Sequence, residues 1–168
     1  MFSSANQAWA TRWEDFNKWN KRFNFTLDVC AGFGDQKCDN FYTPVDNGLA
    51  QDWTTDHNNK SNNFWCNPPY GAQQKIWVNE GFTQKANGVF LLPSRTDTIL
   101  FHDTIVKGQK SGYCEIEFIK GRITFGSDDY WDWVWDQTEL NGKPNSLYKK
   151  YGKMNPAPFA SMLVKCGE

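Results

Sequence analysis

The aromatic residues near the start of the chain recur with the period of an α-helix. Within residues 8–23 their spacings are four, three, three and four positions, and charged residues fill the positions between them. They are Trp9, Trp13, Phe16, Trp19 and Phe23. The spacing predicts an amphipathic helix with these rings on one face. Thr11 is its expected N-cap residue.

Beyond this helix, short apolar runs alternate with helical patterns. Several runs stop at glycine or proline, which is typical of buried strands. The predicted strands are residues 25–31, 62–66, 88–92, 113–119, 122–125 and 159–166, and the predicted helices are residues 76–85 and 98–110. Strands that alternate with helices indicate an α/β fold with a mostly parallel sheet and helices on both faces.

Residues 126–158 interrupt the alternation with a long, polar and aromatic stretch. We predict a single domain over residues 1–168 that carries this stretch as an insertion. Within it, tryptophan alternates with aspartate or valine over residues 128–136. On a strand the three tryptophans share one face, where they could wedge into a duplex or pack on a partner subunit. A hairpin that covers the core explains them equally well.

The composition narrows the class of protein. The formal net charge is −1, which argues weakly against a nucleic-acid coat protein, because such proteins neutralise phosphates with many basic residues. The chain has 9 tryptophans, more than core packing usually requires, so some are expected to stack on a planar ligand or a partner.

The cysteines and the apolar runs indicate the cellular compartment of the protein. The five cysteines are scattered and odd in number, which predicts reduced core residues rather than disulfides or a metal site. The chain does not open like a signal peptide, and no apolar run approaches the roughly 20 residues that cross a bilayer. We expect a cytoplasmic protein without a membrane segment; an oligomer is compatible with the sequence but not indicated.

The strongest chemical signal is the turn Asn67-Pro68-Pro69-Tyr70, directly after the strand predicted at residues 62–66. Open α/β sheets bind ligands at the carboxyl ends of their strands, and the two prolines remove two N–H donors there. The Asn67 side-chain oxygen and the Pro68 carbonyl can accept both N–H bonds of an aromatic amine, which makes its nitrogen more nucleophilic. Tyr70 can stack on an extruded base. The alternative is a strand-ending turn with a packed tyrosine.

Two further segments suit a nucleoside-containing cofactor. Asp28 and the following turn, Ala31-Gly32-Phe33-Gly34, let the backbone approach a nucleoside closely. No phosphate-binding glycine motif accompanies them, so a dinucleotide fits less well. Asp52 and Trp53 supply a carboxylate and a ring that could hold an adenine. An ordinary turn explains each segment about equally well.

Taken in order along the chain, these segments resemble the phage-type DNA N6-adenine methyltransferase (Dam) family. The resemblance covers roughly residues 9–125 and the last strand. The segments that carry it are residues 25–31, 48–49, 52–53, 65–71, 91–98, 101–103 and 118–125. Near the N-terminus the family usually has Trp-x-Thr-Pro, whereas this chain has Arg12 in place of the proline.

The resemblance implies a Rossmann-like methyltransferase fold with S-adenosylmethionine as the methyl donor. The implied acceptor is the N6 amine of an adenine that is flipped out of double-stranded DNA. The implied catalytic residues are Asn67, Pro68, Pro69 and Tyr70. The implied cofactor-binding residues are Trp9, Thr11, Asp28, Ala31, Gly32, Asp52, Trp53 and Asn67.

Contacts with DNA are expected from basic residues in loops. They are Arg95, Lys120, Arg122, Lys143, Lys149 and Lys150. Solvated charges are the alternative for the lysines, and a structural ion pair is the alternative for Arg122. Because Asn-Pro-Pro-Tyr turns also serve RNA adenine and protein amide methylation, those substrates are alternatives to DNA. A catalytically idle nucleic-acid-binding or cofactor-binding module is an alternative of a different class.

Overall fold

Six strands form one central sheet in the computed structural model, which describes residues 7–167. In spatial order they are β2 (Asn40–Phe41), β1 (Leu27–Asp28), β3 (Phe64–Cys66), β4 (Gly88–Pro93), β8 (Ser161–Cys166) and β5 (Cys114–Phe118). The first four pair in parallel, whereas β8 runs antiparallel to both β4 and β5. This confirms the predicted α/β fold with a mostly parallel sheet. The chain start, on which the expected absence of a signal peptide rests, lies outside the described residues.

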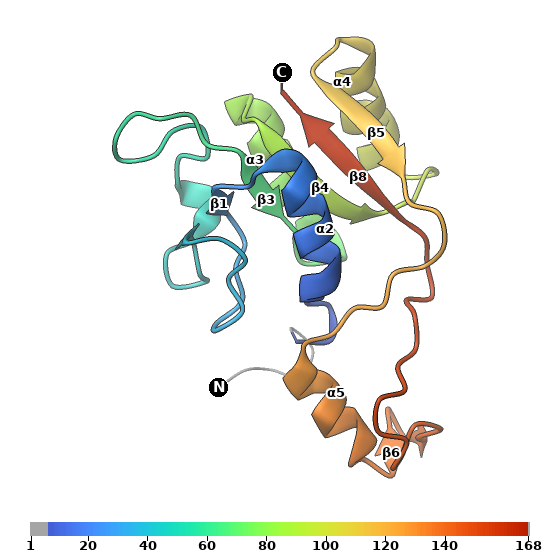
Figure 1. Cartoon of the computed structure of the whole chain (residues 1–168). Helices are drawn as coiled ribbons and strands as arrows, with labels where there is room; N and C mark the ends of the chain where they lie inside the picture. The colour runs from blue at the N-terminus through green and yellow to red at the C-terminus, as the bar shows by residue number, and fades with distance from the viewer. Residues whose placement is uncertain (1–6, 168) are drawn as a thin grey trace.

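Helices cover both faces of the sheet (Figure 1). α2 (Trp13–Phe23) lies on one face, and the other face carries α3 (Ala72–Gln84), the π-helix η2 (Leu100–Val106) and α4 (Lys107–Lys110). Because successive strand side chains point to opposite faces, β3 contributes to both cores. Trp65 packs against α2, while Phe64 and Cys66 pack in the core under α3 and η2.

Several element boundaries differ from those predicted. β1 has two residues rather than seven, and β2 beside it was not predicted. Residues 122–125 lie outside the sheet, so the strand predicted there is wrong; their apolar side chains are buried in the core under α2 instead. Thr11 is not an N-cap residue either. α2 begins after Arg12, which makes no side-chain cap, and Thr11 is buried at the site described below.

Residues 127–156, which we call the lobe, contain a helix where the sequence pattern suggested a tryptophan-rich strand. α5 (Asp128–Trp135) starts at Ser127, whose hydroxyl accepts a hydrogen bond from the Tyr130 N–H at 3.1 Å. A serine N-cap followed by acidic residues favours a helix start. On the helix the three tryptophans do not share a face, since Trp131 and Trp135 are buried and Trp133 is exposed.

The lobe has a small apolar core of its own, built on α5. A hairpin of β6 (Glu139–Leu140) and β7 (Lys143–Pro144) packs beside the helix, and Leu147 lies buried against Trp131 and Trp135. Figure 1 shows the lobe hanging beyond the carboxyl ends of the parallel strands. It therefore lies at the edge of the sheet where ligands bind in such folds.

A short 3-10 turn, η1 (Gly48–Ala50), lies between β2 and β3. Every helix in the described part of the chain is too short or too polar to cross a bilayer.

Candidate active site

The Asn67 side chain is held in one orientation at the end of β3. Its Nδ2 donates hydrogen bonds to the Trp9 carbonyl at 2.8 Å and to Thr11 Oγ1 at 3.1 Å. A backbone carbonyl can only accept, so the amide nitrogen must lie on that side. The Asn67 oxygen is therefore directed the other way, as an acceptor.

Tyr70 provides an aromatic wall beside this oxygen. Its hydroxyl donates to Asn67 Oδ1 at 3.1 Å. Its ring packs edge-on against Trp9, Phe125 and Phe159, with centroids 5.4, 6.0 and 5.7 Å away. Burial raises the pKa of the Tyr70 hydroxyl well above its usual range, so the group stays protonated and keeps its role as a donor.

A cavity of about 330 Å³ lies between the Asn67 turn and the loop after β1. It brings together most of the residues that the sequence singled out as catalytic or cofactor-binding. They are Trp9, Thr11, Asp28, Ala31, Gly32, Asn67, Pro68, Pro69 and Tyr70. They come from three separate segments, and β1 and β3 are neighbours in the sheet, which is why the loops after them meet.

Asp28 forms the floor of this cavity and is 3% exposed. Its carboxylate accepts backbone N–H bonds from Cys30 at 3.3 Å and Lys37 at 3.0 Å. Burial raises the pKa of Asp28 to about 6, and the two hydrogen bonds only partly offset this effect. The Lys37 ammonium forms an ion pair with Asp35 at 2.7 Å and lies 4.5 Å from the centre of the Trp13 ring.

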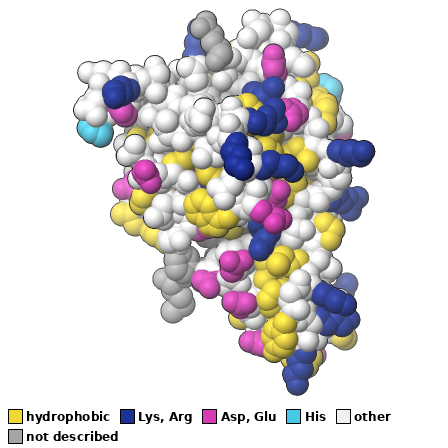
Figure 2. Space-filling model, in the orientation of Figure 1, with side chains coloured by type: hydrophobic (Ala, Val, Ile, Leu, Met, Phe, Trp, Pro, Cys, Tyr) yellow, Lys and Arg dark blue, Asp and Glu magenta, His cyan; other side chains and the backbone are white. Residues whose placement is uncertain are grey.

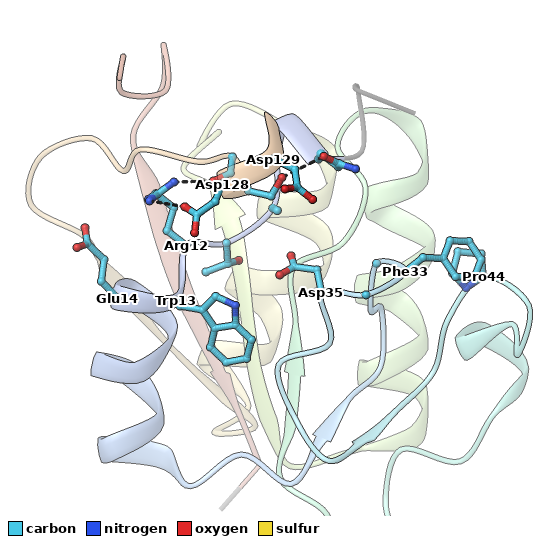
Figure 3. A pocket seen from close by; sticks show the side chains of 15 residues that line it. Arg12, Trp13, Glu14, Phe33, Asp35, Pro44, Asp128 and Asp129 are labelled. Atoms are coloured by element: carbon cyan, nitrogen blue, oxygen red, sulfur yellow. Dashed lines mark hydrogen bonds and ion pairs between the residues drawn. The ribbon is translucent and has the colours of Figure 1, made fainter. Parts of the chain in front are cut away.

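A second cavity of about 560 Å³ adjoins the first (Figure 3). The two share Ala10, Thr11, Gly32, Asp35 and Pro44. Trp13 and Asp35 point into the larger cavity, and Asp128 and Asp129 approach it from the lobe. The volumes fall in the range of about 300–1,000 Å³ that is typical of small-molecule sites.

Arg12 joins the body of the protein to the lobe across this cavity. Its guanidinium donates to the Gly126 carbonyl at 2.9 Å and forms an ion pair with Asp128 at 3.1 Å. This residue stands at the position of the proline in the Trp-x-Thr-Pro element, and no local pattern indicates its role. The contact makes the lobe one wall of the larger cavity.

Asp52 and Trp53 do not line either cavity. Trp53 is fully buried among core rings such as Phe64 and Trp77, and its indole N–H donates to the Gly48 carbonyl at 2.8 Å. A ring without exposed surface cannot stack on an adenine, so the stacking role predicted for Trp53 is corrected to a structural one. The Asp52 carboxylate is exposed and accepts hydrogen bonds from Thr54 and the Thr55 hydroxyl; its cofactor role stays a prediction.

The basic residues expected to contact DNA are all exposed. The Arg95 guanidinium lies 5.6 Å from the centre of the Phe159 ring, next to the aromatic wall around Tyr70. Lys120 and Arg122 follow β5, and Lys143, Lys149 and Lys150 belong to the lobe. Figure 2 shows dark blue side chains along the right-hand edge of the molecule down to the lobe, and magenta side chains on the other side of the lobe.

The sequence patterns did not indicate Phe125 and Phe159, which complete the aromatic wall. Both lie far from Tyr70 in sequence, and only the fold brings them to it. Phe159 belongs to the strand predicted at residues 159–166, although the strand begins at Ser161.

The cysteines are unreactive by environment. All five are free, and Cys66, Cys114 and Cys166 are buried. Burial raises the thiol pKa of Cys30 and Cys38 to about 12, so both are protonated at neutral pH. Within residues 7–167, no group of three His, Cys, Asp or Glu side chains is arranged to hold a metal ion.

Comparison with known proteins gives two matches over most of the chain. The family model of DNA N-6-adenine-methyltransferase (Dam) matches residues 2–149. The DNA N-6-adenine-methyltransferase of Haemophilus phage HP1 (strain HP1c1) is 30% identical over 165 residues, which cover 95% of this chain and 85% of that protein. The family match includes the Asn67 turn, both cavities and most of the lobe.

Proposed function

Because the chain belongs to the DNA N-6-adenine-methyltransferase (Dam) family, we propose that it transfers a methyl group from S-adenosylmethionine to the exocyclic N6 amine of adenine in double-stranded DNA. The observation that carries the proposal is the fixed amide of Asn67, which presents its oxygen as an acceptor at the mouth of a ligand-sized cavity. Such an acceptor binds an N–H group of an amine and makes the amine nitrogen more nucleophilic.

The residues of the Asn67-Pro68-Pro69-Tyr70 turn account for the activation of the adenine amine. The lone pair of the adenine amine is delocalised into the ring, which makes it a weak nucleophile. Asn67 Oδ1 and the Pro68 carbonyl each accept one N–H of the amine and stabilise the positive charge that develops on its nitrogen. Fixed acceptors do this without reorganising during the reaction, and the two hydrogen bonds on Asn67 Nδ2 supply that rigidity.

The two adjoining cavities fit the proposed cofactor. Their lining combines rings and a proline, which suit an adenine base, with the carboxylates of Asp28 and Asp35, which suit hydroxyl and ammonium groups. We assign cofactor binding to Thr11, Asp28, Gly32 and the neighbouring Trp13. When bound, S-adenosylmethionine supplies the activated methyl group. The single reversed strand, β8, in an otherwise parallel sheet supports the finer proposal of a Rossmann-like methyltransferase fold.

The target adenine has to leave the duplex to reach Asn67, because its amine is inaccessible within the base stack. Tyr70 stacks on the extruded base. Basic residues around the site hold the duplex through its phosphates; they are Arg95, Lys120, Arg122, Lys143, Lys149 and Lys150. We propose the cytoplasm as the place of action, where such a duplex is accessible.

Product analysis tests this assignment. The protein is incubated with tritium-labelled S-adenosylmethionine and unmethylated duplex DNA, RNA or protein, and the digested products are separated. We expect the label in N6-methyladenine from DNA. Label in RNA or protein alone would overturn the substrate, and a complete lack of label would favour an idle binding module.

Asn67→Ala tests the mechanism. Removal of one preorganised charge-stabilising group typically lowers kcat by about 100- to 1,000-fold, while cofactor binding should stay close to normal. Turnover is measured at saturating DNA, and cofactor affinity by calorimetry. Asn17→Ala, at an exposed asparagine of α2, is the matched control and should keep full activity. Near-normal turnover of Asn67→Ala would show that Asn67 does not activate the amine.

A further inference from the structure

One segment of the lobe is rich in lysine and tyrosine. Residues 147–153 read Leu-Tyr-Lys-Lys-Tyr-Gly-Lys, and we call this segment the lysine–tyrosine loop. Lys149, Lys150 and Lys153 are exposed. In the described part of the chain, none of these three lysines forms an ion pair with a carboxylate. Their charge is therefore available to a partner outside the protein.

The loop is fixed to α5 mainly through Trp135. Trp135 Nε1 donates to the Lys153 carbonyl at 2.6 Å, and the Lys149 N–H donates to the Trp135 carbonyl at 2.8 Å. Leu147 is buried against the same helix. Lys149 adopts a left-handed backbone conformation (φ 58°), which these contacts hold in place. The loop is thus a preformed element rather than a loose tail, and a preformed surface loses less entropy on binding.

The two tyrosines of the loop, Tyr148 and Tyr151, make different contacts. Tyr151 donates to Asp136 Oδ1 at 3.0 Å, and its ring packs edge-on against Trp135. It therefore helps to fix the loop. Tyr148 is 37% exposed, and the Lys149 ammonium lies 5.2 Å from its ring centre. Tyr151 is 64% exposed, so both rings are accessible to a ligand; we assign the ligand contact to Tyr148 because Tyr151 holds the loop to Asp136.

Charge divides the lobe into two sides. Figure 2 shows magenta side chains on one side of the lobe and dark blue side chains on the other. Dark blue side chains also follow the right-hand edge of the molecule above the lobe, which we call the basic edge. A polyanion can approach the basic edge, whereas the acidic side repels it.

The lobe also reaches the catalytic turn. A cavity of about 280 Å³ is lined by lobe residues, among them Leu147, and by body residues, among them Trp9. Trp9 in turn packs against Tyr70. The lobe thus adjoins the aromatic wall around Tyr70.

From these observations we infer that the lysine–tyrosine loop is a principal DNA-docking element of this enzyme. Lys149, Lys150 and Lys153 bind phosphates of the duplex next to the target adenine, and Tyr148 packs on an adjacent sugar or base. The inference rests on the proposed function, since it takes duplex DNA as the substrate. Aromatic rings interleaved with basic residues are a recurrent means of holding nucleic acid.

Salt dependence gives a quantitative test. Each phosphate contact contributes about 0.9 to the slope of log K against log salt concentration for duplex DNA. We compare the wild-type protein with the triple variant Lys149→Gln, Lys150→Gln and Lys153→Gln, using a fluorescently labelled duplex over a range of NaCl concentrations. The triple variant should bind more weakly, with a slope shallower by about 2 to 3.

A matched variant controls for the change in net charge. Lys75→Gln, Lys107→Gln and Lys110→Gln remove three exposed lysines from α3 and α4 and should leave both affinity and slope unchanged. In the loop variant, the KM for DNA should rise while kcat and cofactor affinity stay normal, which also shows that the protein is folded. Tyr148→Ala should weaken binding by about 10-fold without changing the salt slope, because it removes stacking and no charge.

The two proposals fail in different ways. If the loop variant binds DNA with the wild-type affinity and slope while the wild type methylates DNA, the docking inference is wrong and the proposed function stands. If the wild type binds duplex DNA through the loop but methylates no adenine, the proposed function is wrong and the docking inference stands. Loss of binding in the α3 and α4 control to the same extent would also overturn the inference, because the effect would then follow net charge alone.

Discussion

The Thr11 hydroxyl connects the proposed cofactor cavity to the side-chain amide of Asn67. It is 4% exposed, lines both cavities and accepts the second hydrogen bond of Asn67 Nδ2. Its own proton is then free to be donated elsewhere. We therefore propose that Thr11 is a positioning residue, which acts on the substrate through Asn67.

Thr11→Val tests this role. Valine has nearly the same shape but accepts no hydrogen bond, so Asn67 keeps only the Trp9 carbonyl as a partner. A hydrogen bond of this kind is worth about 1 kcal/mol, and we expect kcat to fall by about 5-fold with little change in the KM for DNA. Thr11→Ser restores the acceptor and should recover most of the rate. Cofactor affinity is measured separately, which shows whether a lower rate arises from weaker cofactor binding instead.

The buried carboxyl of Asp28 makes stability depend on pH. Its pKa is about 6 in the folded protein against an ordinary value of 3.8, so the folded state binds the proton more tightly than the unfolded state does. Stability from this group is therefore present below about pH 4 and is lost as the pH rises to about 6. At about 1.4 kcal/mol per unit of pKa, the loss amounts to about 3 kcal/mol.

Asp28→Asn should remove this dependence. The free energy of unfolding of the cofactor-free variant, measured in urea from pH 4 to pH 7, should rise relative to the wild type by up to about 3 kcal/mol across that range. Asp132→Asn, at an exposed carboxylate of α5, is the control and should run parallel to the wild type. Parallel curves for Asp28→Asn and the wild type would show that Asp28 titrates normally.

At the scale of elements, close packing between β3 and β4 fixes the strand that carries Asn67. Gly88 begins β4 and pairs with Phe64 of β3. A Cβ atom at Gly88 would lie 2.3 Å from the Phe64 ring and 2.4 Å from its carbonyl oxygen. Neither can yield easily, since the ring is fully buried and the carbonyl is backbone.

Gly88→Ala is therefore expected to be destabilising. Overpacking of a dense core typically costs about 1–3 kcal/mol, and the clash with backbone favours the upper end of that range. Gly32→Ala is the comparison, because its nearest neighbour would be the Asp35 Cβ at 3.9 Å, and its stability should be close to that of the wild type. Chemical denaturation measures both, and equal stabilities would show that β3 and β4 can move apart without cost.

Elements with a clear local sequence pattern could be predicted, whereas elements that depend on tertiary contacts could not. β4 was predicted closely, because a continuous apolar run between glycine and proline marks a buried strand. The strand at residues 122–125 was wrong, since burial against α2 gives the same apolar pattern without strand pairing. α5 and the β6–β7 hairpin were missed, although Ser127 before two aspartates and the turn Asn141-Gly142 are local signals for both.

At the scale of the molecule, the lobe and the N-terminal segment jointly enclose the larger cavity. Gly126 and Ser127 donate backbone hydrogen bonds to the carbonyls of Ala10 and Gln7 at 2.9 and 3.0 Å, and Arg12 adds the ion pair with Asp128. A ligand that fills the cavity therefore contacts both parts. Its binding free energy stabilises the junction between them.

Hydrogen exchange can detect this coupling. At a concentration of S-adenosylhomocysteine about 100-fold above its Kd, opening of the cavity costs about 2.7 kcal/mol more. Amides near residues 126–129 that exchange only through this opening should slow by about 100-fold. Amides of the lysine–tyrosine loop should not change. Protection limited to residues 28–37 would show that the lobe takes no part in holding the cofactor.

The predictability of the site follows from where its residues lie. Asn67, Asp28 and Thr11 are each next to a recognisable strand end or motif, so the sequence indicated them and the structure brings them together. The role predicted for Trp53 was wrong, because the sequence pattern of a tryptophan beside an acidic residue is the same at a surface and in a core. The roles of Arg12 and Phe159 could not be read locally, since each depends on a partner contributed by a distant segment.

The antiparallel strand β8 has a consequence for how the protein folds. It joins β4 to β5, and its partners precede it by about half the chain or by the whole length of the lobe. Such non-local pairings close large loops, which slows folding. Until residues 161–166 are in place, the apolar strand β4 exposes an unpaired edge, which can pair with another chain. Refolding of this protein should therefore yield more aggregate as its concentration rises, until β8 covers that edge of β4.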